Sequence, residues 1–580
     1  MTDMKNWTMM VYLAGDNNLS EECVYALKEM KRAGTNGNGS SGKKTSTPIP
    51  GESTQNDDPR ILAQLDATGL GVVEQRYVIE RGDDDGSLTY DVKDVLNTTE
   101  TSYRQVVKEF LAWGLRWDVK YKNFMVVLSG HGAGAEQDFL SKDAPVDALS
   151  IPKLHWIFDE LRKEFRGKPW GVDEDDPKGF KKLAILGMDS CLMSMAEVCY
   201  ELREHVEYLV GAEGFEPNTG WPYERILSEM MSNIEITPKK LATTIVQKYV
   251  DYYRDYHAAN VSVDLSACYL GLCDKLAKAV KDLGIKLRPG LQHYDILNAI
   301  IIAHWKAQSY KNDQYVDLYD FCWVLKDELE KGQIDDAEGI KDACDKVMTV
   351  LLGNTDCAVP AIEEDDEGDE EEPTTFILKS CYSGPAVQYS FGTSIYFPWS
   401  QVSEEYTELE FAQDTNWDKF LLEYVEKTRR EARQPHEVGE EFSSSKIMGN
   451  GGGASIVSIL SSLSPMDVRN GSFNKNGSFN KNGSFNKEMG NQISSMKNAP
   501  QQFYDCPCAH QAAQGRGAKA ASSNGRPKGA AHEATPVYQM TDPSTGRSIQ
   551  IPDPTAMIEE AGKIGQETTK SSKNSRKGKK

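Results

Sequence analysis

The sequence has no hydrophobic run long enough to cross a membrane. Its apolar stretches stop well short of the roughly 18–20 residues that a membrane helix requires. Met1 to Lys5 lead directly into the strand-like run Trp7–Leu13, which lacks the cleavage site of a signal peptide. The 11 cysteines are odd in number and scattered, unlike a disulfide framework. These absences predict a cytoplasmic, reducing location and no membrane span.

Positive charge is scarce over most of the chain. Residues 441–580 hold 18 Lys and Arg against 10 Asp and Glu, a net charge of +8. Because the whole chain has a net charge of −23, the first 440 residues carry −31. An acidic surface repels phosphates, and we therefore expect no nucleic-acid partner. It suits a basic substrate, although solubility alone explains the charge equally well. A glycine-rich nucleotide fingerprint is also missing, because the first strand is followed by Ala14-Gly15-Asp16-Asn17-Asn18.

Strand-like and helix-like segments alternate over the first half of the chain. The pattern predicts strands at Trp7–Leu13, Phe124–Leu128, Leu183–Gly187 and Tyr208–Val210, and helices at Leu19–Ala33, Ser102–Trp117, Ile151–Phe165 and Ala196–His205. Such a rhythm predicts an α/β fold, a three-layer sandwich with a mainly parallel sheet and helices on both faces.

Composition divides the chain into three parts. Residues 1–235 form the α/β core, with a flexible insert at 35–58 that is rich in Gly, Ser, Thr and Pro. Residues 236–434 continue the same unit, interrupted by a solvated acidic loop at 363–372. Residues 435–580 are of low complexity, and we expect this tail to be disordered.

Two of the predicted strands end in residues that can carry chemistry. Leu183–Gly187 leads into Asp189 and Cys191, and Phe124–Leu128 leads into His131 between two glycines. Catalytic groups of α/β sheets lie beyond the carboxyl ends of strands. If these strands are adjacent, His131 and Cys191 share one edge as general base and nucleophile. The N–H groups of Gly132 and Cys191 could then bind an oxyanion during acyl transfer.

The residues around Cys191 suggest two opposite influences on its thiol. Ser194 followed by Glu197 has the spacing of a helix capping box, and a helix N-terminus favours a thiolate. A carboxylate at Asp189 would instead raise the thiol pKa. We therefore interpret Asp189 as the floor of a pocket for a cationic side chain, with capping of the following helix as the alternative.

These segments resemble the clostripain-type cysteine peptidases, which are relatives of the caspases. The resemblance runs from about Trp7 to Tyr424. It implies a caspase-like sandwich that cleaves protein or peptide substrates after Arg or Lys, through a Cys/His dyad and an acyl-enzyme. The matching motifs are WTMMVYLAGDNNL (Trp7–Leu19), SGHGAG (Ser129–Gly134), MDSCLMSMAE (Met188–Glu197), GFEPNTGWPY (Gly214–Tyr223), VDLYDF (Val316–Phe321) and GTSIYFP (Gly392–Pro398).

The resemblance also implies roles for single residues. His131 becomes the base, Cys191 the nucleophile and Asp189 an acid of the pocket that receives the basic side chain. Glu213 and Glu216 are the candidates for a second pocket acid. Ser190 departs from the small Ala that the family usually has before its nucleophile.

Self-cleavage between the two catalytic residues is a further implication of the resemblance. Lys142 is the first candidate site, with Arg166 and Lys168 behind it. Some relatives require calcium, so calcium is a candidate cofactor, which the acidic loop at 363–372 could gather. No other metal site is predicted, because Cys506, Cys508 and His510 make an incomplete zinc set.

A catalytically silent caspase-like scaffold that binds protein partners is the competing hypothesis. The presence of both His131 and Cys191 favours an enzyme over this alternative. The sequence leaves the oligomeric state open.

Overall fold

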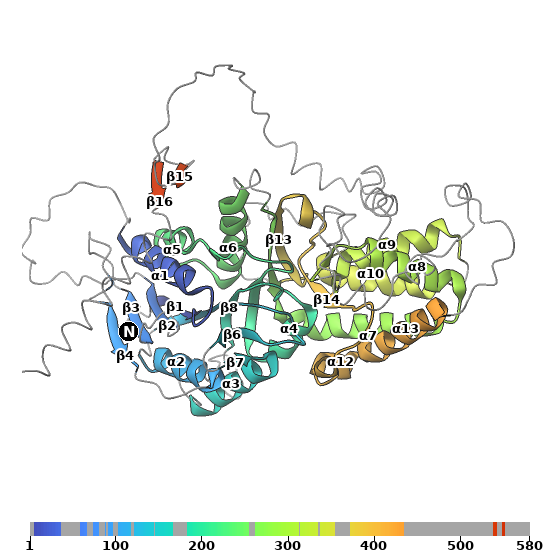
Figure 1. The fold of residues 1–580 in the computed structure, drawn as a ribbon, viewed down its shortest axis with the longest axis horizontal. Coiled ribbons are helices and arrows are strands. Elements are labelled where there is room, and N and C mark those ends of the chain that lie inside the picture. The colour runs from blue at the N-terminus through green and yellow to red at the C-terminus, as the bar shows by residue number, and fades with distance from the viewer. Residues whose placement is uncertain are drawn as a thin grey trace, which may run out of the picture. The chain divides into compact units, whose positions relative to one another are not determined.

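The computed structural model describes residues 5–35, 59–66, 74–79, 88, 91–96, 102–117, 121–143, 146–165, 182–254, 261–311, 314–334, 337–353, 372–433, 538–541 and 548–551 of the chain (Figure 1). The chain divides into two compact units, Met1–Ala512 and Ala513–Lys580. The predicted insert after Thr35 and the acidic run before Glu372 lie outside the described residues.

A mostly parallel sheet forms the centre of the first unit. In the described part of the chain its nine strands follow the order β13-β10-β9-β8-β5-β1-β2-β3-β4. The five central strands run parallel, and β3, β4, β10 and β13 are antiparallel to their neighbours. The bounds are β1 Lys5–Ala14, β2 Arg60–Asp66, β3 Gln75–Ile79, β4 Val92–Val95, β5 Tyr121–Ser129, β8 Leu183–Asp189, β9 Val206–Gly211, β10 Val263–Tyr269 and β13 Ile377–Ser383.

Helices cover both faces of this sheet. Because successive strand residues point to opposite faces, Met9, Val11 and Leu13 of β1 enter one apolar core, while Met10 and Tyr12 enter the other. Helices α1, α5 and α6 pack on the first face, and α2, α3 and α4 pack on the second (Figure 1). Their bounds are α1 Ser20–Thr35, α2 Tyr103–Trp117, α3 Ile151–Glu164, α4 Ala196–Leu202, α5 Tyr223–Ser232 and α6 Pro238–Tyr253. The predicted α/β sandwich is therefore confirmed.

The second half of the unit is mainly helical. Its elements are α7 Cys273–Gly290, α8 Tyr294–Lys306, α9 Leu318–Lys331, α10 Glu338–Leu352, α11 Glu404–Thr407, α12 Glu410–Thr415 and α13 Trp417–Arg433. A small antiparallel sheet joins β11 Ser309–Tyr310, β12 Tyr315–Asp317 and β14 Ser394–Tyr396. Since β10 and β13 complete the main sheet, both halves of the unit share one core.

Two short hairpins lie outside these sheets. Strands β6 Phe139–Asp143 and β7 Val146–Leu149 pair in the interval between β5 and α3. Strands β15 Tyr538–Thr541 and β16 Ser548–Ile551 pair in the second unit. This second hairpin accounts for eight residues of the 435–580 tail, and the rest of the tail lies outside the described residues.

Candidate functional site

Strand pairing brings the His and Cys segments together. Strands β5 and β8 are parallel neighbours, with Ser129 opposite Asp189 at their carboxyl ends. The two loops then continue in contact, since Gly130 N donates to Asp189 O at 3.1 Å. At Gly132 an added Cβ would lie 2.8 Å from Cys191 N and closer still to its carbonyl oxygen, so only glycine fits there. The adjacency on which the predicted dyad depended is therefore present.

The loop that carries His131 is fixed by contacts from the second half of the chain. Tyr315 Oη lies 2.7 Å from Ala133 O and 2.6 Å from Glu136 Oε1, and Lys311 Nζ also donates to Ala133 O. Burial raises the pKa of Glu136 despite the neighbouring Lys311. On the other side of the histidine, Leu140 N donates to His131 O at 2.7 Å. These contacts limit the positions that the imidazole can take.

The imidazole of His131 has a partner that the sequence did not reveal. Its Nε2 lies 2.6 Å from Oδ1 of Asn18, in the loop between β1 and α1. An amide oxygen only accepts hydrogen bonds, so this contact holds the proton on Nε2 and leaves Nδ1 free to act as a base. Asn18 belongs to the segment WTMMVYLAGDNNL, but nothing in the chain alone pairs it with His131.

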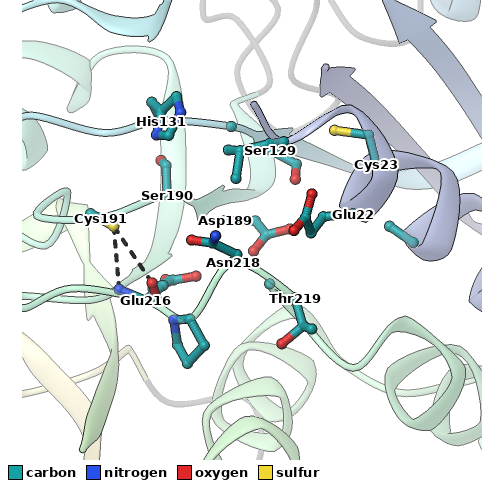
Figure 2. Close-up of a pocket in the computed structure, with 15 residues that line it drawn as sticks. Glu22, Cys23, Ser129, His131, Asp189, Ser190, Cys191, Glu216, Asn218 and Thr219 are labelled. Carbon is teal, nitrogen blue, oxygen red and sulfur yellow. Dashed lines mark hydrogen bonds between the residues drawn. The ribbon is translucent and has the colours of Figure 1, made fainter. Parts of the chain in front are cut away.

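Cys191 lies just beyond β8, with its thiol turned toward the backbone of Glu216. Glu216 N lies 3.3 Å from Sγ and Glu216 O lies 3.8 Å from it (Figure 2). Burial, then the charge of Glu216 and more weakly that of Asp189, raises the pKa of the Cys191 thiol to about 11. The resting thiol is therefore protonated at neutral pH and needs a base to become a nucleophile.

The predicted capping box after Cys191 is wrong. Helix α4 begins at Ala196 with Met195 as its N-cap and has no side-chain cap. Ser194 Oγ instead donates to the backbone oxygen of Gly392 at 2.7 Å, and Glu197 Oε1 accepts from Tyr396 N at 2.9 Å. Both side chains join the core to β14 and its flanking residues, and the pKa of the Cys191 thiol is raised, not lowered as expected.

A pocket opens beside the dyad and is lined by several acidic side chains. Asp189, Glu216 and Glu22 are among its lining residues (Figure 2), and of the residues that line it none is Lys or Arg. Tyr223 Oη donates to Asp189 Oδ2 at 2.6 Å. Gly220, at φ +66°, brings its backbone so close that a Cβ would lie 2.8 Å from Asp189 Oδ1. Asp189 therefore lies under the 216–220 loop.

The two deepest carboxyl groups of the pocket influence each other. Burial raises the pKa of Asp189, and burial together with the charge of Asp189 raises that of Glu216 well above its usual range. Buried carboxylates are normally compensated by a cation. Since the lining contains no Lys or Arg, a cationic guest in this pocket would lower both pKa values. Glu22 of α1 is a pocket acid that the sequence analysis did not identify.

Glu213, the other predicted pocket acid, is absent from the lining. Its Oε2 accepts from Gly392 N at 2.8 Å, inside a buried group that includes Asp264 and Asp317. Burial, followed by those two carboxylates, raises the pKa of Glu213 well above its usual range. Glu213 follows the end of β9 by two residues and is buried in the core, whereas Glu216 lies three residues later, in the loop that lines the pocket.

The buried acidic group does not fit calcium. Asp264 accepts from the N–H groups of Glu213 and Gly214, and Asp317 accepts from those of Asp320 and Phe391. Calcium needs six to eight oxygen ligands, and most of these oxygens are already occupied by backbone donors. The acidic run at 363–372, which the sequence analysis named as the calcium candidate, lies outside the described residues except for Glu372.

Lys142 lies in β6 and pairs with Asp147 of β7. The sequence placed it in a polar stretch that an active site could reach, and the structure adds the pairing to β7. Arg166 and Lys168 lie outside the described residues. None of the helices within the described ranges is both long and apolar enough to cross a membrane.

Comparison with known proteins identifies the family of this chain. The model of a family described as the Clostripain family matches residues 11–424. A secreted C11 cysteine protease from Bacteroides thetaiotaomicron, solved with an irreversible peptide inhibitor, is 16% identical, with 71% of this chain and 99% of that chain covered at a TM-score of 0.47. An inactive zymogen C11 protease from Parabacteroides distasonis is 15% identical, with 72% and 99% covered at 0.41. No curated protein matched. Because these TM-scores lie below 0.5, the assignment of the chain to a family rests on the match to the family model.

Proposed function

The chain belongs to the clostripain family of cysteine peptidases, and from that premise we propose that it is an endopeptidase cleaving after Arg or Lys through His131 and Cys191. One observation carries the specificity: the buried Asp189 and the half-buried Glu216, whose carboxyl oxygens are buried, share one pocket whose lining contains no Lys or Arg. A guanidinium or ammonium group would complete that pocket electrostatically. The pocket lies beside Cys191, where the residue preceding the scissile bond must sit.

In the proposed reaction His131 Nδ1 takes the thiol proton of Cys191, and Sγ attacks the scissile carbonyl carbon. The N–H groups of Gly132 and Cys191 stabilise the oxyanion. The proton held by His131 passes to the leaving amine, and water then hydrolyses the acyl-enzyme. Asn18 keeps the imidazole in the required tautomer, because its Oδ1 accepts from Nε2. Before attack, Sγ must give up its contacts with the Glu216 backbone.

The test uses the full chain and three reporter peptides that differ only in having Arg, Lys or Gln before the cleaved bond. Wild type should cleave the Arg and Lys reporters far faster than the Gln reporter. Cys191→Ala and His131→Ala should abolish cleavage, while Cys381→Ala should not, since Cys381 is a partly exposed free thiol far along the chain on β13. Full activity of Cys191→Ala would refute the proposal.

Thiol labelling separates this function from a silent scaffold. An Arg-directed electrophile should modify Cys191 selectively, and His131→Ala should slow that reaction strongly. A scaffold would show the same labelling rate in wild type and in His131→Ala. The comparison is informative because burial already holds the thiol pKa at about 11, so spontaneous reactivity is low.

Self-cleavage at Lys142 forms a separate part of the proposal. A protease binds its substrate as an extended chain, so cleavage at Lys142 would require β6 to leave β7. Incubated wild type should yield two fragments that Lys142→Gln does not, with Cys191→Ala as the uncleaved control. An Arg-cleaving wild type that stays intact would show that processing is unnecessary.

We further propose a reducing compartment such as the cytoplasm. The support is that Cys23, Cys191, Cys199, Cys268, Cys273, Cys322, Cys344 and Cys381 are all free thiols. Secreted proteins of this size commonly use disulfides instead. Fractionation of cells expressing the tagged chain would test the assignment, and recovery from the medium would overturn it.

A further inference from the structure

A second group of ligand-bearing side chains lies between α3 and the turn after α4, and none of its members lines the pocket. His155 and Asp159 are four residues apart on α3 and so lie on one helix face. His205 directly precedes β9. Asp159 Oδ1 lies 3.6 Å from His205 Nε2, and its Oδ2 lies 3.8 Å from His155 Nε2. One ligand atom from each of the three residues lies within 4.8 Å of the others.

No hydrogen bond joins the converging atoms, which lie 3.6 and 3.8 Å apart. His155 Nδ1 lies 2.7 Å from the carbonyl oxygen of Glu201, which can only accept, so the proton is on Nδ1 and Nε2 presents a lone pair toward Asp159. His205 Nε2 is buried without a hydrogen-bond partner, on a side chain that is 2% exposed. Arg162 Nη1 can only donate to His205 Nδ1, so in this structure the His205 proton is on Nε2, and a metal ion would require the other tautomer. The His155 Nε2 lone pair faces the Asp159 carboxylate across 3.8 Å, an arrangement that is poorly compensated unless a cation lies between them.

We propose that His155, Asp159 and His205 bind a divalent transition-metal ion, with zinc favoured. Imidazole nitrogens with one carboxylate suit zinc, whereas calcium and magnesium prefer oxygen. Zinc bonds of about 2.1 Å at tetrahedral angles separate ligand atoms by about 3.4 Å. The observed 3.6 and 3.8 Å run to different oxygens of Asp159, and one ligand atom from each residue lies within 4.8 Å of the others, so side-chain rotations must draw the three ligand atoms closer together.

The surroundings meet two further requirements of a metal site. The Glu201 carbonyl orients His155, as outer partners commonly do for ligating histidines. The Asp159 side chain is 43% exposed, which provides an entry path and a fourth position for water. Arg162 opposes binding, because its Nη1 lies 3.4 Å from His205 Nδ1, and that nitrogen carries the proton in the metal-bound tautomer.

The bound ion would join two segments that lead to the catalytic residues. Helix α3 lies in the interval between His131 and Cys191, and α4 follows the Cys191 loop. Coordination would therefore fix α3 against the α4–β9 turn. The site is a stabilising clamp, distinct from the dyad.

The test titrates Co²⁺ and Zn²⁺ into the full chain carrying Cys191→Ala, which removes the catalytic thiol as a ligand. We expect one equivalent with a cobalt ligand-field spectrum free of thiolate charge transfer, which separates this site from cysteine-containing sites in the tail. Asp159→Asn and His155→Gln should each weaken affinity at least tenfold, and zinc should raise the Tm of the parent only. The exposed-acid control Glu338→Gln on α10 should bind normally.

Arg162→Gln provides a prediction of the opposite sign. Removing the guanidinium should tighten zinc binding several-fold, because the cation no longer faces His205. Unchanged affinity in both Asp159→Asn and His155→Gln, with circular dichroism like that of the parent, would overturn the proposal. A thiolate-containing cobalt spectrum as the only signal would overturn it equally.

Discussion

Replacing Asp189 by Asn tests how the pocket selects its substrate. Asp189 is 4% exposed, and its carboxyl has no cationic partner among the residues lining the pocket. A substrate guanidinium about 4 Å from this carboxylate gains about 4 kcal/mol at an effective dielectric constant of 20. Loss of that interaction lowers kcat/KM for Arg substrates by about 10³-fold. Asn keeps the shape of the side chain and can still accept from Tyr223 Oη.

The assay compares kcat/KM on reporters with Arg and with Gln before the scissile bond, in wild type, in Asp189→Asn and in the control Glu338→Gln. Only the Arg reporter should lose activity, and only in Asp189→Asn, with the Tm unchanged within a few degrees. Equal losses on both reporters would refute the reasoning, because a catalytic or folding defect does not distinguish the two side chains. Glu338→Gln removes an exposed acid outside the pocket and corrects for net charge.

Three other perturbations test the dyad and the core. Asn18→Ala should lower kcat at least tenfold with little change in KM, while Asn18→Asp restores part of it, because an acceptor is needed at His131 Nε2. Gly132→Ala should reduce kcat/KM by about 10²-fold because its methyl displaces the Cys191 backbone, whereas Gly339→Ala on α10 should have no effect on peptide cleavage. Burial raises the pKa of Glu197 to about 7, so its contribution to stability is complete below the unfolded pKa near 4.5 and is lost as the pH rises through 7. In Glu197→Gln this pH-dependent loss is absent. The free energy of unfolding of the variant, measured by urea unfolding, should therefore rise relative to that of wild type by up to about 3 kcal/mol between pH 5 and pH 8.

The central strands could be predicted because their residues are apolar on both faces. Leu183–Gly187 and Phe124–Leu128 read as buried strands; the structure extends the first to Asp189 and the second to Tyr121 at its start and Ser129 at its end. Element boundaries differed by a few residues. The predicted helix Ala196–His205 ends at Leu202, because the chain turns there to enter β9 at Val206.

The site was only partly visible in the sequence, for reasons of distance along the chain. His131, Cys191 and Asp189 end adjacent strands, and the strand-end rule of α/β sheets identifies such residues. Asn18 and Glu22 approach the site from the first loop and helix, and no local pattern marks them. Ser194 and Glu197 matched a capping box, but contacts with residues some 200 positions away determine their conformation.

The raised pKa of Cys191 and its role as nucleophile become compatible once the pocket is considered with the thiol. After burial, the charges of Glu216 and Asp189 are among the causes that hold this pKa near 11. A cationic side chain bound between those carboxylates offsets their charge, and so lowers the thiol pKa at the moment when substrate is in place. Binding of Arg would thus contribute to kcat as well as to KM. Asp189→Asn should accordingly alkylate faster than wild type with neutral iodoacetamide while cleaving Arg peptides more slowly, a pair of opposite effects that simple loss of folding cannot produce.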